Sequence, residues 1–375
     1  MKSEWKTSPL RDLVGFISKG IAPSYADEES ETTVRVLNQK CNRNFRITYS
    51  ESRLHDLSRK KVPTERFVRI DDILINSTGA GTAGRIAQIC NLPCDTIVDG
   101  HMIIIRANNK VSQKYLGYAM KAHQWEVLQL DEGSTGQTEL NRERLLDEIM
   151  ISYPTSFALQ EMIVKTLEGI DRKLLINEKV NDNLQQQAQA IYASMFVDNA
   201  DPTWQQGHLS DLVTVRYGKD HKKLADGIYP VYGSGGIMRH VERPLYDKES
   251  VLIPRKGTLN NVMYVNQPFW SVDTMFYTEM RLPDVAKFVY HFVKAKDLAA
   301  MNAGSAVPSM TTDILNAMEI AIPPATVLEE FESLVAPMYR AMQGNDAQSK
   351  KLADLRNALL PKLMSGEIDV SDIQL

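Results

Sequence analysis

The stretch Ile149-Met150-Ile151-Ser152-Tyr153-Pro154 decides the architecture, because the chain repeats its pattern. Met318-Glu319-Ile320-Ala321-Ile322-Pro323 is a second apolar run closed by a proline. A helix-like segment follows each proline and ends on a methionine at the same distance, Met195 in the first copy and Met364 in the second. Because an internal repeat sets the architecture of a chain, the sequence predicts two copies of one unit, each a domain followed by a long helix.

Heptad spacing predicts that the two helices pair. Apolar or small residues recur in both segments at alternating intervals of four and three, and both stripes are polar in the middle. An antiparallel pair would set one polar centre against the other, and buried asparagine in such a seam fixes its register. The alternative is that each helix packs only on its own domain. The seam residues of interest are Asn177, Asn181 and Leu184 in the first helix and Asn345, Ser349 and Leu352 in the second.

The domains repeat as well as the helices. Leu10-Arg11-Asp12-Leu13-Val14 matches residues 209–213, and the run 72–79 resembles 250–257. Short β-branched runs bounded by turn residues predict strands in both copies. We therefore expect an α+β fold, in which two mixed α/β domains are joined by two long helices that form an antiparallel coiled coil with a pseudo-two-fold internal repeat. The predicted boundaries are a first domain at 1–155, a helix at 156–198, a linker at 199–206, a second domain at 207–324, a helix at 325–366 and a tail at 367–375.

Composition narrows the class of protein. The chain has 375 residues, a formal net charge of −4 and 3 cysteines. The cysteine content fits a reduced cytoplasm, and neither a signal core at the start nor an apolar run long enough for a membrane span is present. Basic residues gather locally, between Arg35 and Arg69 and again between Arg216 and Lys223. Local basic patches on a mildly acidic chain favour selective DNA binding, although a solvated surface would look the same.

Glycine-rich loops are the candidate contact elements. Residues 79–84 match G-x-G-x-x-G, but a strand-like run follows where a dinucleotide site needs a helix. We interpret this segment as a hairpin loop that lets the backbone approach a ligand closely. Its counterpart at 255–261 is basic, and a third loop at 229–236 holds Tyr232, which either stacks on a base or is half-buried in the domain.

The candidate DNA-binding residues are polar or basic side chains and glycines of these loops and patches. In the first domain they are Lys19, Arg43, Arg46, Ser77, Thr78, Gly79, Gly81, Thr82, Arg85, Thr135, Gln137 and Thr138. In the second domain they are Lys219, Lys222, Lys223, Tyr232, Gly233, Ser234, Gly235, Arg255, Lys256, Asn260, Ser305 and Ser309.

Catalytic and metal-binding patterns are missing from the sequence. The 7 histidines are scattered, with no H-E-x-x-H pair, no Walker A run and no Asn/Asp-Pro-Pro-aromatic motif. We therefore expect neither a catalytic residue nor a metal site in this chain. The alternatives are an enzyme with its own active site for modifying DNA and an adaptor whose domains bind proteins.

The order of these motifs, given twice, resembles the specificity subunit of type I restriction-modification systems over nearly all of the chain. The resemblance rests on Asp71 to Ile75 with its glycine loop, on 229–237, on 251–257, on the run 320–324 before a long helix, and on the ending 359–366. It implies a non-catalytic subunit whose two target-recognition domains each read one half of a bipartite, asymmetric site in double-stranded DNA. It also implies that the helices space these domains and dock two methyltransferase (modification) subunits, which a restriction–translocation subunit joins. S-adenosylmethionine, ATP and Mg²⁺ would then be bound by the partner subunits and not by this chain.

Overall fold

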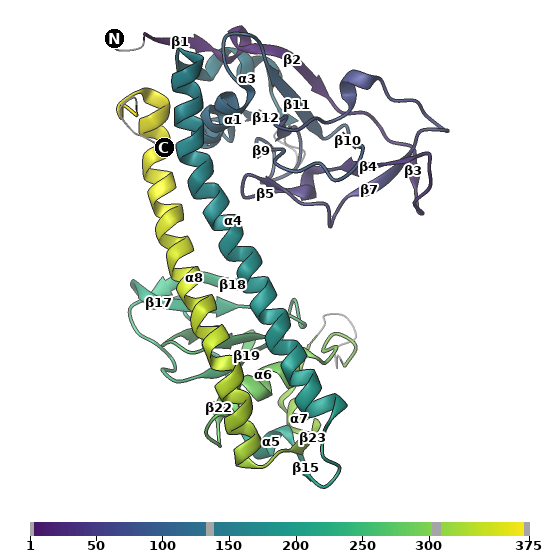
Figure 1. Ribbon diagram of the computed structural model, residues 1–375, viewed down its shortest axis with the longest axis vertical. Coiled ribbons are helices and arrows are strands. Elements are labelled where there is room, and N and C mark those ends of the chain that lie inside the picture. The colour runs from purple at the N-terminus through teal and green to yellow at the C-terminus, as the bar shows by residue number, and fades with distance from the viewer. Residues whose placement is uncertain (1–3, 133–138, 302–308, 371–375) are drawn as a thin grey trace. The chain divides into compact units, whose positions relative to one another are not determined.

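The computed structural model describes residues 4–132, 139–301 and 309–370 (Figure 1). The chain divides into two compact units, of which the first comprises Met1–Ile176 with Gln348–Leu375 and the second comprises Asn177–Ala347. Each unit therefore combines segments from both helical arms with one mixed α/β domain. None of the described helices has the length and apolar content needed to cross a membrane.

The first unit is built on two four-stranded sheets (Figure 1). One has the order β2-β11-β8-β9 and is antiparallel throughout. The other has the order β10-β4-β7-β3, with β10 and β4 parallel. Their bounds are β2 Val14–Lys19, β11 Met102–Ala107, β8 Ile73–Asn76, β9 Ile86–Gln88, β10 Thr96–Val98, β4 Thr33–Leu37, β7 Arg53–Asp56 and β3 Tyr25–Ala26. The strand pairs β1 (Trp5–Pro9) with β14 (Met150–Pro154), β5 (Asn42–Arg43) with β6 (Arg46–Ile47) and β12 (Asp131–Glu132) with β13 (Glu139–Leu140) complete the strands of this unit.

The helix α1 (Gln113–Ala122) packs on the antiparallel sheet of the first unit. It buries Tyr115, Leu116 and Met120 in the core that this sheet shares with the ends of the long helices. Its N-cap serine, Ser112, accepts the Tyr115 amide hydrogen through its side chain, which satisfies one free helix donor. The other short helices are η1 Leu10–Asp12, η2 Gln39–Cys41, η3 Thr64–Arg66, α2 Gln124–Val127 and α3 Arg142–Glu148.

The second unit repeats this plan. Its antiparallel sheet has the order β16-β22-β19-β20, and a second sheet has the order β18-β17-β21 with β17 and β21 parallel. The bounds are β16 Val213–Tyr217, β22 Met275–Met280, β19 Ser250–Pro254, β20 Met263–Val265, β18 Gly236–Val241, β17 Asp226–Gly233 and β21 Trp270–Ser271. The strand pair β15 (Gln205–His208) with β23 (Glu319–Ile322) and the helices α5 (Leu209–Leu212), α6 (Ala286–Lys294) and α7 (Thr312–Asn316) complete the domain.

The antiparallel sheets β2-β11-β8-β9 and β16-β22-β19-β20 have the same strand order, and the parallel pair β4 with β10 corresponds to β17 with β21, whereas the second sheet has four strands in the first unit and three in the second. The central strands β8 and β19 contain the runs that the sequence comparison paired, and the matched leucine-rich segments form η1 in one copy and α5 in the other. Gly20 and Gly218 follow β2 and β16, and a Cβ on either would collide with a backbone carbonyl of the strand end beside it. The predicted internal repeat and α+β class are therefore confirmed.

The long helices are α4 (Phe157–Ala193), which runs into a π-turn at Ser194–Asp198, and α8 (Ala325–Ser365). Within the second unit, Asn177 Nδ2 donates to the Asn345 carbonyl oxygen at 3.3 Å, Asn181 Nδ2 donates to that of Met342 at 3.4 Å, and the Tyr192 ring contacts the Phe331 ring. The residue numbers of the partners on α8 decrease as those on α4 increase, so the two helices run antiparallel within this unit.

Polar side chains satisfy one another at the centre of this seam. Asn345 Nδ2 donates to Asn181 Oδ1 at 2.8 Å, and Asn181 Nδ2 donates to Asp346 Oδ1 at 2.8 Å. Leu184, three residues after Asn181 on α4, and Leu352 on α8 are each half-buried. Because a buried amide left unpaired is costly, this pairing favours one register of the helices over its neighbours.

A buried histidine makes the stability of the second unit depend on pH. His291 on α6 is fully buried, its Nδ1 donates to Gln189 Oε1 at 2.8 Å, and its Nε2 accepts the Tyr339 hydroxyl hydrogen at 2.9 Å. Burial lowers the pKa of His291 from 6.5 to about 4. The unfolded chain binds this proton more tightly than the folded unit does. The contribution of neutral His291 to the free energy of unfolding is therefore fully present above pH 6.5, and it falls by about 3 kcal/mol in all as the pH drops from 6.5 to 4.

Urea unfolding of the second unit between pH 7 and pH 4 measures this loss, with a His291→Gln variant as the reference. The variant should lack the part of the pH dependence that lies between 6.5 and 4. Equal pH dependence in both proteins would contradict the assignment to His291.

Candidate nucleic-acid interface

The glycine loop of the first domain joins two antiparallel strands. β8 and β9 pair from Ile73 with Gln88 to Ile75 with Ile86, so residues 77–85 form the turn of a hairpin, as predicted, and no helix follows them. Gly79, Gly81 and Gly84 have φ values of 112°, 67° and 82°, a region that favours glycine. A Cβ on Gly79 would lie 2.7 Å from Gln39 Oε1, so this loop is pressed against the segment that follows β4.

Most candidate side chains of this loop bond within the domain. Thr78 Oγ1 lies 2.7 Å from His101 Nδ1, Thr82 Oγ1 donates to the Gly79 carbonyl oxygen at 3.2 Å, and Arg85 donates to that of Gly81 at 3.0 Å. Ser77 is fully buried beneath the loop. Ser77 is therefore not placed to contact DNA in this conformation, and Ala80 and Gly81 are the exposed residues of the loop.

The basic candidates of the first domain lie on its surface. Lys19 ends β2 and pairs with Glu139, whereas Arg43 and Arg46 flank the turn of the β5–β6 hairpin. Asn44 and Phe45 at this turn both have positive φ, 52° and 61°, which is the signature of a type I′ turn. Thr135, Gln137, Thr138 and Ser305 of the second copy lie outside the described residues.

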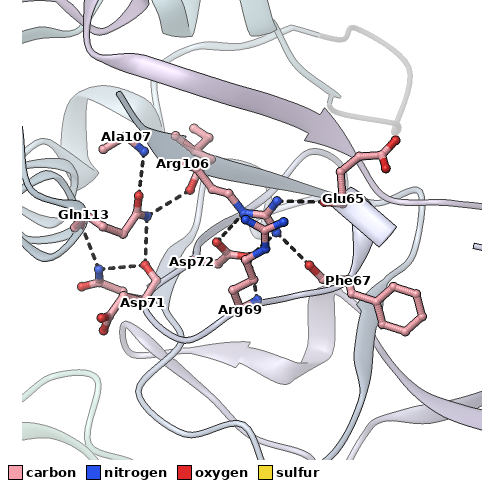
Figure 2. A network of polar contacts seen from close by, with 10 residues as sticks. Glu65, Phe67, Arg69, Asp71, Asp72, Arg106, Ala107 and Gln113 are labelled. Carbon is pink, nitrogen blue, oxygen red and sulfur yellow. Dashed lines mark hydrogen bonds and ion pairs between the residues drawn. The ribbon is translucent and has the colours of Figure 1, made fainter. Parts of the chain in front are cut away.

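A buried ion pair fixes the segment that enters β8 (Figure 2). Arg106 on β11 donates Nε to Asp72 Oδ1 at 2.7 Å and Nη2 to Asp72 Oδ2 at 2.8 Å, and the two side chains are 12% and 2% exposed. The same guanidinium donates to the carbonyl oxygens of Glu65 and Phe67, while Asp72 Oδ2 accepts the Arg69 amide hydrogen. The strand that carries the glycine loop is thus anchored at its start.

The basic loop of the second domain follows β19. Arg255 Nη1 donates to the Asp273 carbonyl oxygen at 3.3 Å and its guanidinium lies 5.4 Å from the centroid of the exposed Tyr217 ring. Lys256 is exposed, and its backbone forms an isolated bridge with Ser309. Asn260 instead bonds Asp297 Oδ1 and the Ala299 amide, so it holds the loop in place.

The third loop is the two-residue turn between β17 and β18, where Gly233 pairs with Gly236 and Ser234 and Gly235 form the turn. Tyr232 is only 9% exposed, its ring meets Phe269 edge to face, and burial raises its pKa. The half-buried alternative for Tyr232 is the one observed, because the hydrophobic core behind the sheet holds the ring. Ser234 is half-buried, and Lys219, Lys222 and Lys223 are exposed on the segment after β16.

Within each domain, the hairpin loop contacts the segment that follows the strand β4 or β17, and this contact is equivalent in the two copies. β4 pairs with β10 as β17 pairs with β21, so Leu37 corresponds to Tyr232 and Gln39 to Ser234. A Cβ on Gly257, at φ 85°, would lie 2.6 Å from Ser234 Oγ, and one on Gly79 would lie 2.7 Å from Gln39 Oε1. Sequence reasoning missed Gln39, because no motif marks it and only strand register makes it the counterpart of Ser234.

Among residues 4–132, 139–301 and 309–370, no three His, Cys, Asp or Glu side chains gather as a metal ion would require. A family model described as the type I restriction modification DNA specificity domain matches residues 2–186 and 202–329. The chain belongs to this family. The two matched stretches include the two domains and the greater part of the first long helix, so this type I specificity subunit carries the DNA specificity domain twice over.

Known specificity subunits resemble the chain over all or part of its length. The type I restriction enzyme MjaIX specificity subunit of Methanocaldococcus jannaschii is 23% identical over 416 residues, covering 99% of this chain and 95% of its own. The HindI specificity subunit of Haemophilus influenzae is 28% identical over 92 residues, or 24% of this chain and 18% of its own. The crystal structure of the type I S subunit from M. genitalium matches with a TM-score of 0.60 and 16% identity over 99% of this chain and 98% of that one, which shows a shared fold.

Proposed function

We propose that this chain is the non-catalytic DNA-reading subunit of a type I restriction-modification complex in the cytoplasm, and that each domain reads one half of a bipartite, asymmetric site. The observation that carries the proposal is one scaffold with two different sets of loops. The antiparallel sheets have corresponding strand orders, yet the turn after β8 contains one arginine, Arg85, which donates to a carbonyl oxygen of the same turn. The turn after β19 contains two basic side chains, Arg255, which donates to the Asp273 carbonyl oxygen, and Lys256, which is exposed. Equivalent scaffolds with different side chains suit the reading of two different base sequences.

We further propose that the helices dock two methyltransferase subunits and that a restriction–translocation subunit joins this assembly. Leu175 and Ile176 on α4 and Leu355 on α8 are 41%, 45% and 48% exposed, and a partner would cover such apolar side chains. S-adenosylmethionine, ATP and Mg²⁺ would be bound by those partners. The lengths of α4 and α8, about 55 and 60 Å at ~1.5 Å per residue, would set the number of unread base pairs between the half-sites.

Genome-wide methylation mapping in cells with and without the chain tests the proposal. We expect a bipartite methylated motif only when the chain is present together with its methyltransferase. Replacing the second domain by that of a related subunit should change one half of the motif alone. Inserting four residues after Asn181 should lengthen the unread spacer.

Two outcomes would favour the other classes of protein. An unchanged methylation map on removal of the chain would favour a protein-binding adaptor. Methylation or cleavage of DNA by the purified chain without partners would favour an enzyme with its own active site. An unchanged spacer in an active insertion variant would reject the role of helix length while leaving the reading function intact.

A further inference from the structure

The first domain contains an open cavity of about 450 Å³ beside its glycine loop. Every residue lining it carries a polar group in its side chain, and the argument below uses Tyr25, Gln39, Lys40, Glu51, Arg53 and Asp99. These residues come from β3, from η2 after β4, from the turn before β7 and its first residue, and from the turn between β10 and β11. The cavity is therefore lined by turns and strand ends.

Gln39 has a polar atom that the fold leaves unused. Its Oε1 is buried and accepts no hydrogen bond from any described residue. Native proteins seldom leave a buried carbonyl oxygen unpaired, and such an atom calls for an explanation beyond packing. Gln39 lines the cavity and touches the glycine loop, so a ligand in the cavity would supply the missing donor.

The internal repeat gives Gln39 a second, independent link to the DNA-reading loops. Gln39 occupies the position that Ser234 holds in the second domain, and each lies against a positive-φ glycine of the neighbouring hairpin loop. The corresponding pairs, Gln39 with Gly79 and Ser234 with Gly257, therefore mark one place on the shared scaffold. Two domains that use one scaffold to read DNA would place base contacts there in both copies.

The charges of the cavity select the kind of ligand. Lys40 and Arg53 are donors, Glu51 and Asp99 are acceptors, and the Arg53 guanidinium lies 3.4 Å from the centroid of the Tyr25 ring. A phosphate would require donors alone, whereas base edges present both donors and acceptors. Glutamine and arginine are also the side chains that most often bond adenine and guanine edges in two places.

We propose that this cavity takes the edge of a nucleobase from the half-site read by the first domain, and that Gln39 and Arg53 determine which base is accepted. The inference rests on the proposed function, because it names residues of the same reading surface. Lys19, Arg43 and Arg46 would then contact phosphates around it, which positions the DNA without reading its sequence.

The test is methylation mapping with the chain co-expressed with its methyltransferase, comparing wild type with Gln39→Ala, Gln39→Glu and Arg53→Ala. We expect each variant to relax or change one position of the first half-site, so that methylation of sites with another base there rises roughly ten- to hundredfold. The second half-site should stay as in wild type. Gln39→Glu preserves the side-chain shape, and Arg53 is exposed. Neither Gln39→Glu nor Arg53→Ala therefore leaves an empty space in the hydrophobic core that would destabilise the fold.

Gln129→Ala is the matched control, because Gln129 is an exposed glutamine of the same domain that does not line the cavity. It should leave the motif unchanged. An unaltered first half-site in all three cavity variants would overturn the inference, as would an equal loss of methylation at every site, which indicates a phosphate contact. If the wild-type chain confers no bipartite motif, the proposed function itself fails, and the two failures are thus distinguishable.

Discussion

Asp72→Ala will destabilise the first domain by about 3–5 kcal/mol, the range found when one partner of a buried ion pair is removed. The Arg106 guanidinium would remain in a site where its side chain is only 12% exposed, with the carboxylate that balances its charge gone. The same substitution frees the Arg69 amide at the start of β8 (Figure 2). Urea unfolding followed by hydrogen exchange of β8 and β11 peptides measures the change, with β19 and β22 as internal references.

The double variant Asp72→Ala with Arg106→Met separates charge from packing. It removes both charges while keeping an apolar side chain of similar length, so it should recover a large part of the lost stability. A double variant as unstable as Asp72→Ala alone would show that the hydrogen bonds from Arg106 to Glu65 and Phe67, and not the unpaired charge, account for the loss.

The double substitution Arg255→Ala and Lys256→Ala will weaken binding to the cognate DNA by roughly ten- to a hundredfold at physiological salt, if each side chain neutralises one phosphate. Loss of two phosphate contacts should also lower the slope of log affinity against log salt by about 1.8. Both side chains belong to the loop after β19, and neither forms an ion pair with another of the described residues, so the fold should tolerate their removal. Fluorescence anisotropy over a salt series measures affinity and slope together.

Lys248→Ala is the control for this prediction, because Lys248 is an exposed lysine of the same domain outside the three candidate loops. It should change neither quantity by more than a small amount. A double variant with reduced affinity but an unchanged salt slope would mean that Arg255 and Lys256 contact base edges and not phosphates. Unchanged affinity would remove this loop from the interface.

Local patterns were sufficient to predict the architecture. The repeated proline-closed runs became β14 and β23, each followed by a long helix, and the stripes with polar centres became an antiparallel seam in which Asn181 meets Asn345. The glycine run at 79–84 was correctly assigned to a hairpin because the residues after it alternate as a strand does. These features depend on periodicity and on neighbours in the chain, which a sequence displays directly.

The orientation of loop side chains could not be predicted in this way. Ser77 and Tyr232 have hydroxyl groups and lie in or beside predicted loops, which made them candidate contact residues. In the structure Ser77 is fully buried under its own turn and Tyr232 packs on Phe269. Asn260 was a candidate contact residue, and its amide instead holds Asp297 and Ala299. The partners of Tyr232 and Asn260 are distant in sequence, so the neighbouring residues in the chain give no sign of them.

The sequence by itself determined that this protein has two copies of a domain and a helical arm, because repeats and heptads are written along the chain. Only the tertiary structure decided which residues meet at the candidate nucleic-acid interface. Gln39 reaches Gly79, and Ser234 reaches Gly257, because parallel pairing of β4 with β10 and of β17 with β21 fixes where the segments that follow β4 and β17 begin. Strand register is a property of residues far apart in sequence, and it is set by the packing of the whole domain.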